Sequence, residues 1–151
     1  MNWTMHPGEG VAELSLSGSI SAERLLLANH LLPSIPGWSP DFNVLIEIDP
    51  RSDLSALDLK TLKGLQARLR EVLEGSRAGA HPRTAILCGA SHQRPIAWLW
   101  SFLTEEDWPV ETAVFGQRRS AFAWLRGEAE PVAHGGAASD GAQPCGQAEP
   151  A

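Results

Sequence analysis

Hydrophobic residues recur at two spacings along residues 1–126, and the alternation between them predicts five strands and four helices. Short apolar or alternating runs, with a period near two, predict strands at residues 3–5, 11–18, 43–49, 83–89 and 110–115. Segments with helical spacing predict helices at residues 21–33, 55–74, 94–103 and 120–125. Residues 7–10, rich in Pro and Gly, predict a turn that joins the first two strands into a hairpin.

Helix-capping residues set the expected boundaries. Ser21 is placed to cap the first helix, and Pro33 to end it. For the second helix, Ser55 followed by Asp58 resembles a capping box, and Gly75 is a typical residue to follow the last turn. We therefore expect the second helix to begin near Ser55.

The order of elements predicts the fold class. After the first two strands come a helix and three strand–helix units, an order typical of an α/β domain with right-handed crossovers. We expect a small, mainly parallel five-stranded sheet with four helices, formed by residues 1–126. Residues 127–151 are rich in Ala, Gly, Pro and Glu, which predicts a disordered acidic tail.

The segment at residues 110–127 predicts how the last helix packs. Phe115 ends the strand, Gly116 lets the chain turn, and the helix that follows presents a small and two large side chains. These are Ala121, Trp124 and Leu125. We expect this helix to fold back and cover one face of the sheet.

Taken together, "RTAILCG", the apolar helix after it and "VETAVFGQRRSAFAWLRG" resemble the bacterial SpoIIAA-like proteins. These belong with the STAS domains (sulfate transporter and anti-sigma factor antagonist) and the related CRAL–TRIO lipid-carrying domains. "SGSISAERL" and "NVLIEID" fit the first half of the same pattern, so the resemblance spans residues 2–126. It implies a domain that binds a protein partner or an apolar ligand, without catalysis.

STAS antagonists carry a phosphorylatable serine at the start of the second helix, in an Asp-Ser-Ser-Gly-like motif. Here the position of that serine is Leu59, after Asp58, and the glycine is absent. The nearby hydroxyls of Ser52 and Ser55 are the remaining candidate phosphoacceptors, which keeps a serine-controlled antagonist as one alternative function.

Composition excludes several classes of partner. The net charge is −6 and all 12 Lys and Arg residues lie at or before Arg126 without clustering, so we expect no nucleic acid partner. No apolar run is as long as a membrane span. Only two cysteines occur, Cys88 and Cys145. We therefore expect a cytoplasmic protein without membrane insertion or a structural disulfide.

Few residues suggest chemistry. Cys88 with His92 four residues on could form a nucleophile and its base, but Cys88 continues an apolar strand, which is typical of a small buried hydrophobe. The five histidines are scattered, so we expect no metal, no cofactor and no enzyme activity. Arg118 and Arg119 precede the last helix, where an anion could bind at the helix N-terminus.

The helix at residues 94–103 is apolar on all sides. Trp98 and Trp100 are about 200° apart on a helical wheel, so they cannot both face one sheet. Either the loops that hold Trp38 and Trp108 cover the second side, or a partner covers it. We expect a binding or regulatory module whose surface for a protein partner, a homodimer or a small apolar ligand is formed by Leu26, Trp98, Trp100 and Phe102.

Overall fold

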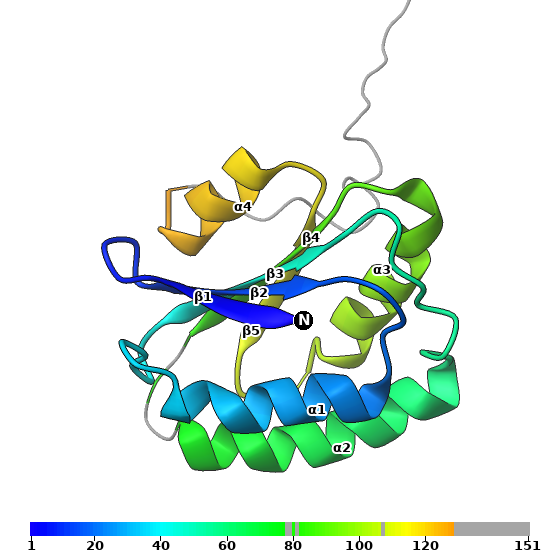
Figure 1. Ribbon diagram of the computed structural model, residues 1–151, viewed down its shortest axis with the longest axis horizontal. Coiled ribbons are helices and arrows are strands. Elements are labelled where there is room, and N and C mark those ends of the chain that lie inside the picture. The colour runs from blue at the N-terminus through cyan, green and yellow to red at the C-terminus, as the bar shows by residue number, and fades with distance from the viewer. Residues whose placement is uncertain (78–79, 81, 107, 129–151) are drawn as a thin grey trace, which may run out of the picture.

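The computed structural model describes residues 1–77, 80, 82–106 and 108–128, which form a five-stranded sheet with helices on both faces (Figure 1). The strands are β1 (Asn2–His6), β2 (Val11–Leu16), β3 (Asn43–Ile48), β4 (Arg83–Cys88) and β5 (Glu111–Phe115). The helices of the described residues are α1 (Ala22–Leu31), α2 (Leu59–Ser76), α3 (Arg94–Leu103) and α4 (Arg118–Leu125), with short 3₁₀ turns at Leu32–Ser34 and Ser91–Gln93. This confirms the predicted α/β class and order of elements.

The sheet is mixed, which corrects the prediction of a mainly parallel one. Its strand order is β1-β2-β3-β4-β5; β1 pairs antiparallel with β2, and the other three pairs are parallel. The antiparallel pair follows from the turn at residues 7–10, where the backbone N–H of Glu9 donates to the carbonyl of His6 at 3.0 Å. A turn this short can only join antiparallel neighbours.

The three crossover helices cover one face of the sheet. From β2 to β5 each strand is added beside the previous one in the same direction, so right-handed crossovers place α1, α2 and α3 on the same side. Helix α4 follows β5 and lies on the opposite face (Figure 1). The sheet therefore has a thickly covered face, called here the crossover face, and a face covered by α4.

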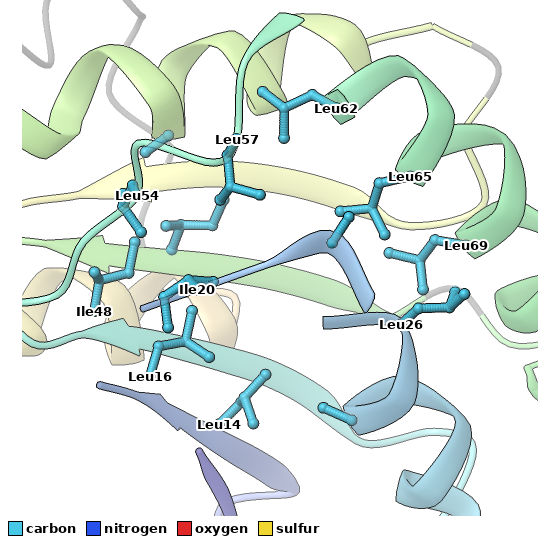
Figure 2. Close-up of a cluster of buried hydrophobic side chains, with 14 of the residues drawn as sticks. Leu14, Leu16, Ile20, Leu26, Ile48, Leu54, Leu57, Leu62, Leu65 and Leu69 are labelled. Atoms are coloured by element: carbon cyan, nitrogen blue, oxygen red, sulfur yellow. The ribbon is translucent and has the colours of Figure 1, made fainter. Parts of the chain in front are cut away.

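The main core lies on the crossover face. Helix α2 buries one stripe of leucines, Leu62, Leu65, Leu69 and Leu73, at helical spacing, as predicted. Figure 2 shows Leu62, Leu65 and Leu69 gathered with leucines of β2, such as Leu14. Each such side chain removed from water contributes about 1.5–3 kcal/mol, so this layer dominates the stability of the domain.

Helix α2 begins at Leu59, and the prediction of a start at Ser55 is wrong. The cap is Asp58, whose carboxylate accepts a hydrogen bond from the backbone N–H of Thr61 at 2.8 Å. The backbone N–H of Ser55 instead donates to the carboxylate of Asp53 at 2.9 Å. Residues 54–57 form a turn that buries Leu54 and Leu57, and the helix starts only after both are buried. Gly75 lies inside the helix, which ends one residue later.

Helix α4 covers its face as the sequence predicts. Ala121, Trp124 and Leu125 are buried, and the Trp124 ring lies 5.4 Å from that of Phe115. Side chains of the sheet also bind the end of the helix: Asn43 donates to the carbonyl of Leu125 at 2.8 Å, and Arg83 donates to that of Trp124 at 2.6 Å. These bonds satisfy carbonyls that a helix end leaves without partners.

Residues 129–151, which hold nearly all of the predicted tail and Cys145, lie outside the described residues. No helix in the described part of the chain is both long and apolar enough to cross a membrane.

Candidate functional site

The most exposed large apolar side chain among the described residues is Phe102, near the end of α3, with 66% of its surface exposed. Trp98 lies one turn earlier and is half-buried. Side chains four residues apart share one side of a helix, so the two form one apolar surface, called here the α3 surface. Phe102 is therefore not part of the core.

Trp100 belongs to the other side of α3 and is covered by the chain itself. Its ring meets that of Trp108 edge to face, with centroids 5.6 Å apart, and the guanidinium of Arg70 lies 5.7 Å from the Trp108 ring. Trp100 also lines the space between α3 and the sheet and stays half-buried, as Trp98 does, so the loop that holds Trp108 covers only part of the core-facing side. Trp38 packs elsewhere, in a cluster with Leu32 and neighbours.

Leu26 is a core residue, so its assignment to the binding surface is wrong. Only 7% of it is exposed, and it packs in the main core beneath α1 (Figure 2). The exposed leucines of α1 are Leu27 and Leu31. Leu25, Leu26 and Leu27 are equally apolar, so the sequence does not show which of them faces the core. In the structure Ala22 and Ala28 also pack against the core, and this orientation of α1 turns Leu26 inward.

A small apolar cavity lies between the sheet, α2 and α3. Its volume is ≈ 80 Å³. Besides Trp100 of α3, its walls are aliphatic side chains of these elements, of α1 and of the loop before α2: Leu16, Leu25, Ile46, Ile48, Leu54, Leu57, Leu62, Leu65, Leu69, Ile86, Ile96 and Ala97. This is the feature that the predicted alternative of an apolar-ligand carrier requires.

A second concave region, of ≈ 570 Å³, lies at the carboxyl ends of β3 and β4, where open α/β sheets commonly bind ligands. It brings together Ser52, Ser55 and His92. Ser55 is exposed, whereas Ser52 is buried and donates its hydroxyl to the carbonyl of Leu16 at 3.2 Å. Of the two candidate phosphoacceptors, only Ser55 is therefore accessible to a kinase.

The floor of this region is organised by Gln93, which the sequence reasoning missed. Only 1% of Gln93 is exposed, and its amide donates to the carbonyls of Asp49, Pro50 and Ser52 at 2.9–3.2 Å. These bonds hold the loop after β3 against the start of α3. The available signal was a glutamine two residues before Pro95, where a polar side chain can reach a neighbouring loop.

Cys88 and His92 do not form a catalytic pair in this geometry. Cys88 is fully buried, and its thiol contacts the carbonyl of Ala90 at 3.7 Å and the amide oxygen of Gln93 at 3.9 Å. Burial raises the pKa of the Cys88 thiol, which disfavours the thiolate that a nucleophile needs. His92 is exposed on the outer side of its turn.

Arg118 meets two carboxylates on the face covered by α4. Its guanidinium binds Glu13 through two bonds of 2.8 Å and Glu47 through one of 2.7 Å, and His6 lies 2.7 Å from the same Glu13 carboxylate. These contacts neutralise Arg118 and remove it from the predicted anion site. Arg119 remains exposed beside it.

The electrostatics of this cluster follow from its contacts. The hydrogen bonds from Arg118 lower the pKa of Glu13 to about 2, against the opposing effect of burial. Burial and the neighbouring Glu13 raise the pKa of Glu47. The sequence signal was a glutamate inside each of two strands that are otherwise apolar, "VAELSL" and "NVLIEI". A buried carboxylate requires a cation, and α4 supplies it.

No group of three His, Cys, Asp or Glu side chains in the described residues is arranged to hold a metal ion. Comparison with known proteins finds no matching family model, no similar curated protein and no similar solved structure.

Proposed function

We propose that the chain is a non-enzymatic binding module, and that its partner binds the α3 surface. The exposure of Phe102 beside half-buried Trp98 carries this proposal, because a contiguous apolar patch on a helix is typical of an interaction site. The burial of Cys88 argues against the enzyme alternative, because a substrate cannot reach a fully buried thiol.

The area of the surface favours a protein partner over a homodimer. A stable interface buries about 800 Å² per partner. The exposed part of Phe102 contributes only about 130 Å² and half-buried Trp98 adds less, so two copies that meet through these rings alone are far below that area. A protein partner can bury the Phe102 ring in a pocket and surround it with a rim of further contacts, which adds the area that one side chain lacks.

Selection of displayed peptides tests the proposal. A library is panned against the full chain, and the selected peptides are measured against Phe102→Ser and Leu31→Ser. We expect Phe102→Ser to weaken binding by at least about tenfold, the cost of losing a buried aromatic anchor, without unfolding the domain. Leu31→Ser is an exposed apolar control on α1 and should leave affinity unchanged. Peptides that bind both variants equally would place the docking site elsewhere.

A carrier of a small apolar ligand is the second candidate, and the apolar cavity favours it. Its ≈ 80 Å³ is below the range of about 300–1,000 Å³ for typical ligand pockets, so a long lipid does not fit without opening of the helices. Native mass spectrometry of the purified chain should retain a small bound mass if this function operates. A spectrum with only the protein mass would count against it.

The order of elements also supports a place among the SpoIIAA-like domains. One antiparallel strand, three parallel pairs and four helices follow the order that the resemblance implies. We propose this relationship as the framework for the binding role, with control through Ser55 as the form of regulation that such domains use.

A further inference from the structure

The inward stripe of α2 ends in an arginine. Leu62, Leu65, Leu69 and Leu73 face the core, and the next position at this spacing is Arg77, which follows the last turn of the helix. Only 4% of Arg77 is exposed. Its guanidinium therefore lies beneath the end of α2, at the edge of the core where the strands begin.

The contacts of Arg77 are to neutral groups. Nη1 donates to the carbonyls of Pro40 at 3.2 Å and Phe42 at 2.7 Å, and the guanidinium lies 5.6 Å from the ring of Trp38. No carboxylate of the described residues pairs with it. Burial lowers the pKa of Arg77 to about 10, so it stays charged at neutral pH. A buried charge without a counter-ion is costly, and proteins usually pair it.

Two of the unpartnered polar groups belong to residues of one cavity. Among the described residues four buried side-chain atoms lack a partner: Nη2 of Arg77, Oγ1 of Thr112, Nε1 of Trp38 and Nε1 of Trp124. Arg77 and Thr112 line one cavity of ≈ 50 Å³, between α2 and the sheet. Asn29 and Thr84 contribute further polar side chains to its wall. A cavity with a cation and free donors is suited to an anion.

The apolar cavity described above lies next to this one. Ile46, Leu69 and Trp100 line both. Along α2 the apolar cavity takes the first part of the leucine stripe and the polar cavity takes its end, so the two follow one another between the helix and the sheet. The chain thus offers a cationic end and an apolar extension in one buried region.

We propose that this region binds a small carboxylate with a short apolar tail. The carboxylate binds the free Nη2 of Arg77 and the hydroxyl of Thr112, and the tail enters the apolar cavity past Leu69. Both cavities are smaller than the engineered cavity of about 150 Å³ that holds benzene, so the tail has only a few carbons. The inference gives a ligand class to the carrier function and is independent of the α3 surface.

Water or chloride could also occupy the polar cavity. One or two water molecules fit ≈ 50 Å³, but they leave the charge of Arg77 without a counter-ion. Chloride supplies the charge but gains nothing from the apolar cavity. Affinity that rises with the length of the tail therefore separates a carboxylate ligand from both.

The experiment is a titration of the full chain with sodium acetate, butyrate and hexanoate, with 1-butanol and sodium chloride as controls at constant ionic strength. Binding is read from the indole N–H signals of Trp3, Trp100 and Trp108 in ¹H–¹⁵N spectra, because these residues line the polar cavity. We expect saturable shifts with butyrate, about tenfold tighter than with acetate, since two further buried CH₂ groups favour binding. 1-Butanol and chloride should cause no saturable shift.

Variants locate the site. Thr112→Val keeps the shape of the side chain and removes the hydroxyl, and it should weaken butyrate by about tenfold, the value of one charge-assisted hydrogen bond. Arg77→Met should abolish binding. Lys60→Met removes an exposed cation from the same helix and should bind as the wild type does, as should Phe102→Ser.

Several outcomes would overturn the proposal. These are no saturable shift with any carboxylate, equal affinity for chloride and butyrate, or unchanged butyrate binding by Thr112→Val. If Arg77→Met does not fold, the wild-type titrations and Thr112→Val still decide the question. Failure here leaves the docking role of Phe102 standing, because the peptide selection does not depend on either cavity.

Discussion

Arg118 and Arg77 lie on opposite faces of the sheet, and their charges are treated in opposite ways. Arg118 is half-exposed, yet it meets two carboxylates at 2.7–2.8 Å. Arg77 is buried, yet it meets only two carbonyls and an aromatic ring. The cation that water could solvate has counter-ions within the described chain, and the cation that water cannot reach has none there.

The difference in counter-ions indicates a structural role for Arg118 and fits the ligand-binding role that we propose for Arg77. The contacts of Arg118 with Glu13 and Glu47 join α4 to β2 and β3, so the chain completes this cluster by itself. At Arg77 the described chain supplies only the carbonyls of Pro40 and Phe42 and the ring of Trp38, which carry no formal charge. The carboxylate ligand that we propose would supply the missing counter-ion and an acceptor for Nη2 of Arg77.

The largest expected effect comes from removing Arg118. Arg118→Met leaves Glu13 buried without its cation, and we expect the free energy of unfolding to fall by about 3 kcal/mol, measured by urea denaturation at pH 7. Arg119→Met, the neighbouring exposed arginine, is the control and should change it by less than about 0.5 kcal/mol. Equal effects of the two substitutions would mean that the cluster contributes no more than the exposed surface does.

A change of pH tests the same cluster without removing Arg118. The folded-state pKa of Glu13 is about 2, below its ordinary value of 4.5, so its contribution to stability is present above pH 4.5 and lost as the pH falls toward 2. The raised pKa of Glu47 acts with the opposite sign, since its contribution is present at low pH and lost as the pH rises through its folded-state value. We expect a net loss of stability on acidification, because the shift of Glu13 is the larger of the two.

The variant Glu13→Gln isolates this contribution. Unfolding curves for the wild type and for Glu13→Gln, taken at several values between pH 6 and about pH 2, should converge as Glu13 becomes protonated. Carboxylates outside the cluster titrate alike in both proteins and cancel in the difference, whereas that of Glu47, whose pKa Glu13 raises, does not cancel. Curves that stay a constant distance apart would show that the ionised carboxylate of Glu13 does not carry the pH dependence.

The comparison also explains what the sequence could and could not predict. The leucine stripe of α2 and the Trp124 face of α4 were predictable because each fills one side of an element with apolar groups. The start of α2 was not, because both Ser55 and Asp58 are good caps and the burial of Leu54 and Leu57 decides between them. Leu26 was misassigned because its neighbours Leu25 and Leu27 are equally apolar, so that only the tertiary packing shows which leucine is buried.

The two arginines show that burial can be predicted from the sequence more readily than charge pairing. Spacing along α2 places Arg77 on the inward side, so its burial could have been predicted from the stripe alone. Its lack of a carboxylate could not, because counter-ions are supplied by residues distant in sequence. Glu13 lies 105 positions before Arg118 and meets it only because β2 and α4 pack together. Pairing of this kind depends on the tertiary structure.

Apart from the Arg119→Met control, the smallest expected effect on stability is that of Arg77→Met, which tests the difference between the two arginines directly. The substitution removes a buried unpaired charge but also leaves the carbonyls of Pro40 and Phe42 without a donor. These effects oppose each other, and replacement of a buried charge by an apolar side chain is often neutral, so we expect a loss below about 1 kcal/mol in urea denaturation at pH 7. Addition of butyrate should raise the free energy of unfolding of the wild type and leave that of Arg77→Met unchanged, because only the protein that carries the Arg77 guanidinium binds butyrate. A loss larger than that of Arg118→Met would mean that Arg77 acts mainly by holding residues 40–42 to α2, and the buried charge would then need no ligand.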